Sequence, residues 1–162
     1  NIQSKTFFEF HKLRYVYTPQ LTIINQGAFW NCFSLFQIVG EQIKDIRQSC
    51  FNGCASLSKI SLSSLDVLEN QSFKCKSLQI VKMLQLKSIP ENSFSGNQSL
   101  FYIDCSNVNE INNLLSQQAK LGYVRLPLVQ NFKLNTNTLI KSDVNNFENC
   151  QLIDEMPSIE EL

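Results

Sequence analysis

A leucine recurs at an almost constant interval along most of the chain. The interval is 21 or 22 residues, and the leucines are Leu13, Leu35, Leu57, Leu78, Leu100 and Leu121. An aliphatic residue follows three positions later in each copy: Val16, Ile38, Ile60, Val81, Ile103 and Val124. A unit this short cannot enclose a core by itself, so neighbouring units must stack to bury their apolar side chains. The chain is therefore predicted to be a repeat protein.

Other columns keep the same period. Apolar residues stand eight and eleven positions after each leucine, and a phenylalanine usually precedes it by six; Phe73 is displaced by one, where the copy is one residue short. The apolar segments are too short for independent helices and are separated by polar turns. They predict parallel strands that pair from copy to copy at a spacing of about 4.8 Å. The expected fold is a mainly β solenoid of about seven rungs of 21–22 residues, with short helical or irregular turns.

The repeats delimit one predicted solenoid domain that covers residues 1–162. Clear copies run over residues 7–132, and a weak last copy occupies residues 147–162, where Phe147, Cys150 and Ile153 keep the spacing. The residues between them, 133–146, are rich in asparagine and are predicted to form an inserted loop outside the stack. The chain opens without a methionine, and we expect it to be a fragment of a longer protein.

Three stretches resemble a known family. "GAFWNCFSL", "SCFNGCASLSKISL" and "NSFSGNQSL", with Leu126-Pro127, are similar to the BspA-like subclass of leucine-rich repeats. The resemblance implies a leucine-rich-repeat solenoid and an interaction scaffold of the kind found in surface-exposed and receptor-like proteins. Asn97 and Gln118 replace the cysteine of the pattern in the fifth and sixth copies, and neither change affects the predicted fold.

The cysteines occupy repeat positions. Cys32, Cys54, Cys75 and Cys150 stand three residues before the repeat leucine, and Cys50 and Cys105 fall in two other columns that are small or inward-facing. We therefore predict a column of buried, reduced thiols, with disulfides between neighbouring rungs as the alternative. Zinc sites usually combine paired cysteines with histidine. The one histidine, His11, lies outside the cysteine column, so we predict no metal site and no cofactor.

Charge and hydropathy exclude two classes of partner. Fourteen basic residues balance fourteen acidic ones, so the sequence lacks the basic stripe that nucleic acid requires. No apolar run reaches the eighteen or so residues of a membrane span. We predict neither nucleic-acid binding nor membrane insertion by this segment. The compartment stays open between the cell surface and the cytoplasm.

Residues between the inward-facing positions of the first strand in each rung face outward. All four tyrosines of the chain fall at such positions. The predicted ligand-binding residues form two clusters: Arg14, Tyr15, Tyr17 and Phe36, then Phe101, Tyr102, Tyr123 and Arg125. Tyrosine and arginine dominate interface hot spots. Aromatic residues also favour strands for structural reasons alone, which is the alternative interpretation.

Enzymatic activity is not predicted. A β-helix-type carbohydrate-active enzyme would need clustered carboxylates on one face, whereas Asp104 is the single acidic residue at the outward strand positions. We expect a non-catalytic scaffold that binds a protein ligand, or a glycan, through its aromatic-rich face. The alternatives are such an enzyme and a purely structural repeat spacer within a larger protein.

Overall fold

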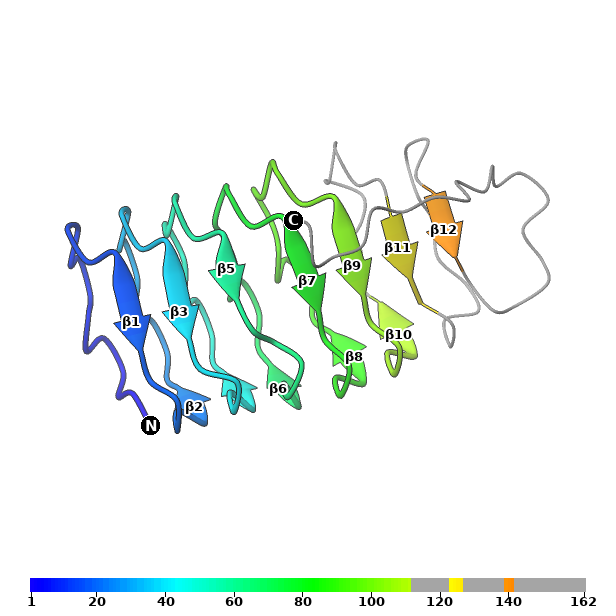
Figure 1. Ribbon diagram of the computed structural model, residues 1–162, viewed down its shortest axis with the longest axis horizontal. Helices are drawn as coiled ribbons and strands as arrows, with labels where there is room; N and C mark the ends of the chain where they lie inside the picture. The colour runs from blue at the N-terminus through cyan, green and yellow to red at the C-terminus, as the bar shows by residue number, and fades with distance from the viewer. Residues whose placement is uncertain (112–122, 127–138, 142–162) are drawn as a thin grey trace.

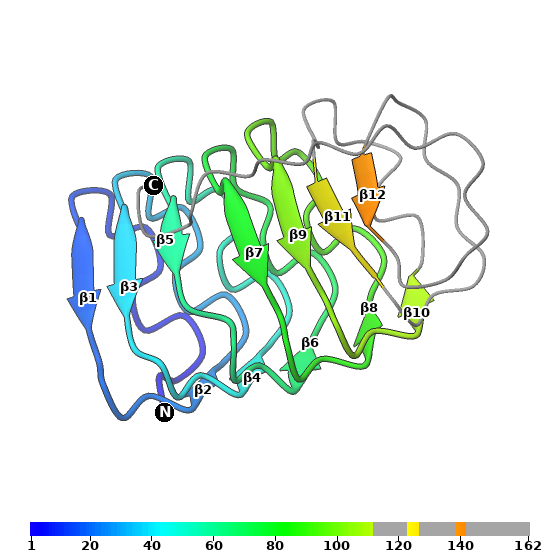
Figure 2. The same cartoon turned by 45° about the vertical axis from the view of Figure 1, so that its right-hand side comes forward.

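The computed structural model describes residues 1–111, 123–126 and 139–141. Short strands stack in two rows (Figures 1 and 2). The first row, here the front face, consists of β1 (Tyr15–Tyr17), β3 (Gln37–Val39), β5 (Lys59–Ile60), β7 (Ile80–Lys82), β9 (Tyr102–Asp104), β11 (Tyr123–Arg125) and β12 (Leu139–Lys141). The second row, the back face, consists of β2 (Ile23–Ile24), β4 (Asp45–Ile46), β6 (Val67–Leu68), β8 (Ser88–Ile89) and β10 (Glu110–Ile111). Turns connect the rows, and the described residues contain no helix.

Every strand pairing in the described chain is parallel, and the register follows the repeat. On the front face Val16 pairs with Ile38, and Ile38 pairs with Ile60. Further along, Ile103 lies between Val81 and Val124. The predicted leucine-rich-repeat solenoid is therefore confirmed, including the residues that stand side by side in neighbouring rungs.

The core lies between the two rows. Most residues of the inward aliphatic columns are buried, and a column of phenylalanine rings runs along the turns on one side. Neighbouring rings in this column stack with centroids 5.1–5.5 Å apart: Phe7, Phe29, Phe51, Phe73 and Phe94. Aromatic rings at this separation gain energy beyond the burial of their area. The column therefore joins consecutive rungs on the turn side.

The turn around each of these phenylalanines uses left-handed backbone. One left-handed residue precedes the ring by two positions: Lys5, Gly27, Ser49, Gln71 and Asn92. Another follows it by two positions: Glu9, Asn31, Gly53 and Gly96. The fourth rung lacks the second of these residues, because Phe73 is only five residues from Leu78. The residue missing from that rung is therefore lost from the turn.

Two glycines in these turns give a matched stability prediction. Gly53 has φ +79°, and a Cβ there would lie 2.4 Å from Oδ1 of Asn31. Gly96 has φ +76°, but its Cβ would meet nothing closer than Lys74 at 3.8 Å. Alanine in left-handed backbone costs about 1–2 kcal/mol. Urea denaturation should show that loss for Gly96→Ala and a larger loss for Gly53→Ala; equal losses would mean that Asn31 moves aside freely.

The stack is interrupted between the third and fourth rungs. The front face divides into β1-β3-β5 and β7-β9-β11-β12, and the back face into β2-β4-β6 and β8-β10. Ser58 N donates to Phe36 O at 3.1 Å and Phe101 N to Gln79 O at 3.0 Å. No corresponding bond joins Gln79 N to Ser58 O, although both residues lie in the described part of the chain. We call this break in both faces the seam.

A proline accounts for the break on the back face. On the back face Arg47 N donates to Ile24 O and Glu69 N to Ile46 O, both at 3.0 Å. The next residue in that column is Pro90, which has no N–H to donate. On the turn side the rungs stay joined across the seam. Gly53 N donates to Lys74 O there at 3.0 Å.

Part of the predicted inserted loop is a strand in the structure. Leu139–Lys141, within residues 133–146, forms β12 and pairs with β11, so that Ile140 lies opposite Val124. Leu139 follows its partner Tyr123 by only 16 residues, so the search for a 21- or 22-residue period missed it. The open edge of β11 needs a partner for its backbone groups, and a short apolar segment provides one. The weak last copy, residues 147–162, lies outside the described residues.

Candidate recognition surface

The first predicted cluster is exposed on the front face. The burial of β1 alternates, with Val16 inward and Tyr15 and Tyr17 outward. The exposed fractions of Tyr15 and Tyr17 are 61% and 77%, and that of Phe36 is 37%. Arg14 is also exposed. We call Arg14, Tyr15, Tyr17 and Phe36 the aromatic surface.

The side chains of this surface contact one another. The Tyr15 and Phe36 rings meet edge to face with centroids 6.0 Å apart. Lys59 Nζ lies 5.8 Å from the centroid of the Phe36 ring, which is within the range of a cation–π interaction. These contacts hold the rings in place on a sheet whose backbone is already fixed by its hydrogen bonds.

A hollow of about 360 Å³ adjoins the aromatic surface. It is lined by Lys12, Arg14, Ser34, Phe36 and Ser56. Two of these residues are cationic, and the ion pairs among the described residues involve neither of them. We call it the cationic hollow. It offers charged and hydroxyl donors beside an aromatic wall.

The second predicted cluster is less exposed than the first in the residues that the structure describes. Phe101 is half-buried, and Tyr102 is only 7% exposed, so the prediction that Tyr102 is exposed is wrong. Its strand has a neighbour on each side, whereas Tyr15 lies in an edge strand. Arg125 forms an ion pair with Asp104 at 3.6 Å. Tyr123 lies opposite Tyr102 in the sheet, but its side chain lies outside the described residues.

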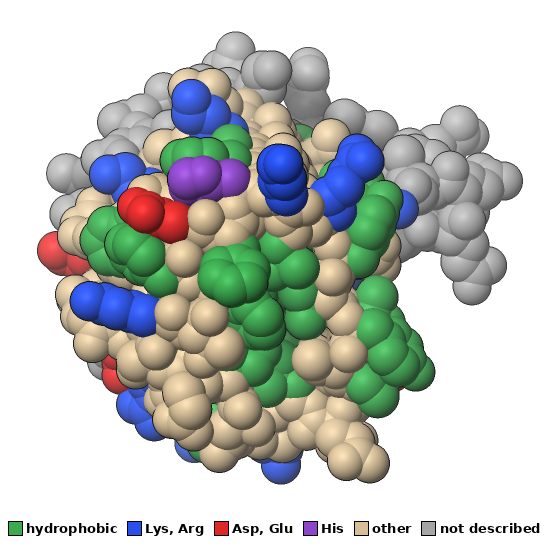
Figure 3. All heavy atoms as spheres, turned by 90° about the vertical axis from the view of Figure 1, so that its left-hand side faces the viewer, with side chains coloured by type: hydrophobic (Ala, Val, Ile, Leu, Met, Phe, Trp, Pro, Cys, Tyr) green, Lys and Arg blue, Asp and Glu red, His purple; other side chains and the backbone are tan. Residues whose placement is uncertain are grey.

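Sequence reasoning missed an aromatic group at the N-terminal end of the stack. Phe10 is 54% exposed and Phe33 is 45% exposed. The ring of Phe33 stacks on His11 at 4.8 Å, and Phe10 packs edge to face on Phe7 at 5.7 Å. Figure 3 shows hydrophobic side chains gathered at the middle of this end. Phe10 occupies the cysteine position of the first rung, and this departure from the pattern was a signal available in the sequence.

The thiols are structural. The five cysteines in the described residues are buried and free: Cys32, Cys50, Cys54, Cys75 and Cys105. Cys32 Sγ donates to Phe7 O at 2.9 Å, and Cys54 Sγ donates to Phe29 O at 3.0 Å, so each thiol bonds to the rung before it. Burial raises the pKa of Cys32 to about 11 and those of Cys50 and Cys75 to about 12. Burial also raises the pKa values of Cys54 and Cys105. The predicted buried thiols are confirmed for these five, and Cys150 lies outside the described residues.

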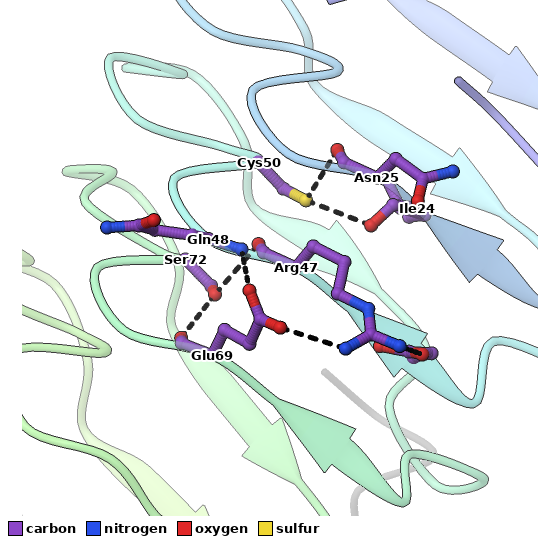
Figure 4. A network of polar contacts seen from close by, with 8 residues as sticks. Ile24, Asn25, Arg47, Gln48, Cys50, Glu69 and Ser72 are labelled. Carbon is purple, nitrogen blue, oxygen red and sulfur yellow. Dashed lines mark hydrogen bonds and ion pairs between the residues drawn. The ribbon is translucent and has the colours of Figure 1, made fainter. Parts of the chain in front are cut away.

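A polar network joins the second and third rungs on the back side (Figure 4). Arg47 donates to Asp45 and, at 2.9 Å, to Glu69, whose other oxygen accepts from Gln48 N at 2.8 Å. The hydrogen bond from Arg47 lowers the pKa of Glu69, whereas burial raises the pKa of Asp45. Ser72 Oγ donates to the carbonyl oxygen of Arg47 at 3.2 Å. The network joins neighbouring rungs and needs no ligand to explain it.

Carboxylates do not gather into a catalytic or metal-binding group within the described chain. No three His, Cys, Asp or Glu residues lie close enough there to hold a metal ion. Asp104, the one carboxylate at the outward front positions, accepts from Ser106 Oγ at 2.8 Å and pairs with Arg125. Its oxygens are therefore engaged within the fold.

The seam opens a second hollow on the front face. Its volume is about 380 Å³, and Ser58, Lys59, Ser61 and Gln79 are among its lining residues. Ile60 also lines it and is half-buried, although it belongs to the inward column. Ser58 Oγ is buried without a hydrogen-bond partner. The hollow follows from the broken ladder between β5 and β7.

Comparisons with known proteins agree with this geometry. The model of the BspA-type leucine-rich-repeat region matches residues 1–122 in six copies. The chain belongs to this family. It is also similar in structure to a leucine-rich cell surface protein from Faecalibacterium prausnitzii A2-165, with a TM-score of 0.63 and 25% sequence identity over 85% of this chain.

The match to that structure is partial. The chain spans 41% of the length of the Faecalibacterium protein. A search of curated protein sequences finds no match. Within the described residues, no helix has the length and hydropathy of a membrane span. The family match and the structural neighbour together define a repeat scaffold. The neighbour is a cell surface protein.

Proposed function

We propose that this chain is a non-catalytic interaction module that binds a protein ligand through the aromatic surface. The observation that carries the proposal is the exposure of Tyr15 and Tyr17, at 61% and 77%, on consecutive outward positions of one strand. Folding requires Val16 between them but not the two outward rings. Exposed aromatic patches on soluble domains usually mark binding sites.

The physical mechanism is passive recognition. Tyr15 and Tyr17 each have only two rotatable side-chain bonds, so they lose little conformational entropy when a ligand covers them. Arg14, at the edge of the same strand, can fix the orientation of the ligand by hydrogen bonds. The stacked backbone below does not need to rearrange. The favourable free energy of the contacts is therefore not reduced by a rearrangement of the scaffold.

The family supports an interaction role over catalysis. The chain belongs to a family of repeat scaffolds. The solved structure that it resembles is a leucine-rich cell surface protein, which supports a place at the cell surface. The carboxylates of Asp45, Glu69 and Asp104 are held in ion pairs. A glycosidase would need such groups free and paired across a substrate. The second predicted cluster is not part of this proposal, because Tyr102 is buried and Arg125 is paired.

The test is a double variant, Tyr15→Ser with Tyr17→Ser. The native chain and the variant are screened against arrays of extracellular proteins and of glycans. We expect a native protein ligand whose affinity falls about 30-fold or more in the variant, because hot-spot truncations cost about 2 kcal/mol or more. The melting temperature should stay unchanged, since Val16 remains in the core.

Val67→Ser is the matched control. Val67 is 42% exposed and lies on the back face, so its replacement should leave binding intact. A glycan that binds through Tyr15 and Tyr17 would replace the protein ligand in the proposal. Absence of any ligand sensitive to these tyrosines would favour a structural spacer instead.

A further inference from the structure

We propose that the seam is a hinge. The solenoid alternates between the open form of the structure and a closed form in which β5 pairs with β7 as the other front-face strands pair. The turn side is the axis of this motion, and closure removes the hollow that lies between the two strands. This inference is independent of the proposed function, because the seam lies in a different part of the front face.

The first bond of the front-face ladder has a fixed place in the repeat. The amide two positions after a repeat leucine donates to the carbonyl oxygen one position after the leucine of the preceding rung. Tyr102 N donates to Gln79 O in this way at 3.2 Å. Across the seam the same rule would join Ile80 N to Ser58 O. That bond is absent, although both residues lie in the described part of the chain.

The last bond of the ladder follows a rule of the same kind. The amide five positions after a repeat leucine donates to the carbonyl oxygen four positions after the leucine of the next rung, as Met83 N does to Asp104 O at 2.8 Å. The corresponding pair at the seam is Leu62 N and Lys82 O. These two described residues do not form that bond. The ladder is therefore open at both ends of β5 and β7, and these strands lie farther apart than β3 and β5 (Figures 1 and 2).

The sequence permits closure on the front face. Residues 58–62 and 79–82 contain no proline, so every N–H that the ladder needs is present. Backbone groups without partners are costly away from water, and pairing would satisfy them. Closure would also bury Ile60, which is half-buried, whereas Ile38 and Val81 in the same column are only 2% and 1% exposed.

The turn side provides a continuous axis. Phe51 N donates to Ser72 O across the seam at 2.9 Å. Ser77 Oγ donates to Ala55 O at 2.7 Å, close to the start of β7. The rings of Phe51 and Phe73 stack between these two bonds at 5.2 Å. A rotation about this side can change the separation of β5 and β7 while these contacts stay in place.

Pro90 opposes closure on the back face. Arg47 N and Glu69 N each donate to a carbonyl oxygen of the preceding rung, and the corresponding acceptor for residue 90 is Leu68 O. Proline has no N–H to donate, so the closed form would leave Leu68 O without this donor. The gain on the front face is therefore offset in part on the back face, and both forms stay accessible.

The experiment is relaxation-dispersion NMR of backbone amides in the native chain and in Pro90→Ala. Hinge motions fall on the microsecond to millisecond timescale that this method detects. In the native chain we expect dispersion at the amides of Ile80 and Leu62. We expect none at Tyr102 and Cys105, which hold the same repeat positions and donate to Gln79 O and Arg125 O in an intact ladder.

Pro90→Ala supplies the missing donor on the back face. The ratio of closed to open molecules should increase about fivefold, the usual effect of one net hydrogen bond on an equilibrium. Hydrogen exchange at Ile80 and Leu62, on the opposite face from the substitution, should become slower. Pro19→Ala is the matched control, because Pro19 lies in the turn between β1 and β2, and it should change neither quantity.

Three results would overturn the hinge. Flat dispersion with exchange at the unfolded rate at Ile80, in both proteins, would mean that the seam is permanently open. Exchange at Ile80 as slow as at Tyr102 in the native chain, without dispersion, would mean that it is permanently closed. Dispersion at Ile80 that Pro90→Ala leaves unchanged would show local fraying of β7 rather than a motion that couples the two faces.

Discussion

Replacing Phe51 by alanine is expected to lower the free energy of unfolding by about 3–5 kcal/mol, as for other fully buried phenylalanines. The ring is completely buried. It stacks between Phe29 at 5.5 Å and Phe73 at 5.2 Å. The contact with Phe73 also bridges the seam, where neither face has a ladder. The loss should therefore include part of the coupling between the two halves of the stack.

Urea denaturation followed by circular dichroism measures both effects. Phe33→Ala is the matched control, because Phe33 is 45% exposed at the end of the stack, and it should cost less than about 1.5 kcal/mol. In Phe51→Ala we expect a smaller denaturant slope or two separate transitions, since uncoupled halves unfold independently. A change of less than about 1 kcal/mol with an unchanged slope would contradict the role of the phenylalanine column.

Alkali is expected to unfold the chain between about pH 9 and pH 11. In the unfolded chain a cysteine ionises near pH 8.5. Burial raises the pKa in the folded state, to about 11 for Cys32 and to about 12 for Cys50 and Cys75. The folded state therefore holds the protons longer than the unfolded state. The stability that the buried thiols contribute is complete below the pKa of the unfolded state. It is lost as the pH rises toward the pKa values of the folded state.

The expected slope is large. Each buried thiol contributes about 1.4 kcal/mol per pH unit above pH 9, so the five described thiols together give about 7 kcal/mol per unit. Urea denaturation at pH 8, 9 and 10 in the presence of a phosphine reductant measures it. A loss of this size would cancel the unfolding free energy of an ordinary domain, about 5–15 kcal/mol, within two pH units.

Cys50→Ser provides the control. Ser72 occupies the same column and donates to the carbonyl of Arg47, as Cys50 Sγ donates to that of Asn25. The substitution should change stability at pH 7 by less than about 1.5 kcal/mol and reduce the alkaline slope by about 1.4 kcal/mol per pH unit. A native chain whose stability is flat to pH 10 would show that its thiols are already oxidised or exposed.

The period of the leucines was enough to predict the register of most strands. A side chain's direction on a strand depends only on alternation, so Val16, Tyr15 and Tyr17 could be placed inward and outward without coordinates. Cysteine burial followed from the same count. These features depend on local spacing, which a sequence records directly.

Features that depend on the neighbouring rungs could not be predicted in this way. Tyr102 and Tyr15 occupy the same repeat position, yet one is buried in a central strand and the other is exposed at an edge. Arg125 is paired because Asp104 lies in the adjacent rung. Leu139 breaks the period and was missed for that reason. The missing residue before Leu78 and Pro90 were visible in the sequence, but the break in both ladders required coordinates.

The seam makes the solenoid mechanically uneven. Under tension along the stacking axis, hydrogen bonds between β1, β3 and β5 resist as a ladder, as do those between β7 and β9. Between β5 and β7 the load falls on the turn side, where the Phe51–Phe73 stack and the Gly53–Lys74 bond remain. A pulled molecule should open there first, with the turn side as the last connection between the two halves. The aromatic surface lies on the first and second rungs of the intact β1-β3-β5 ladder, so it would keep its shape.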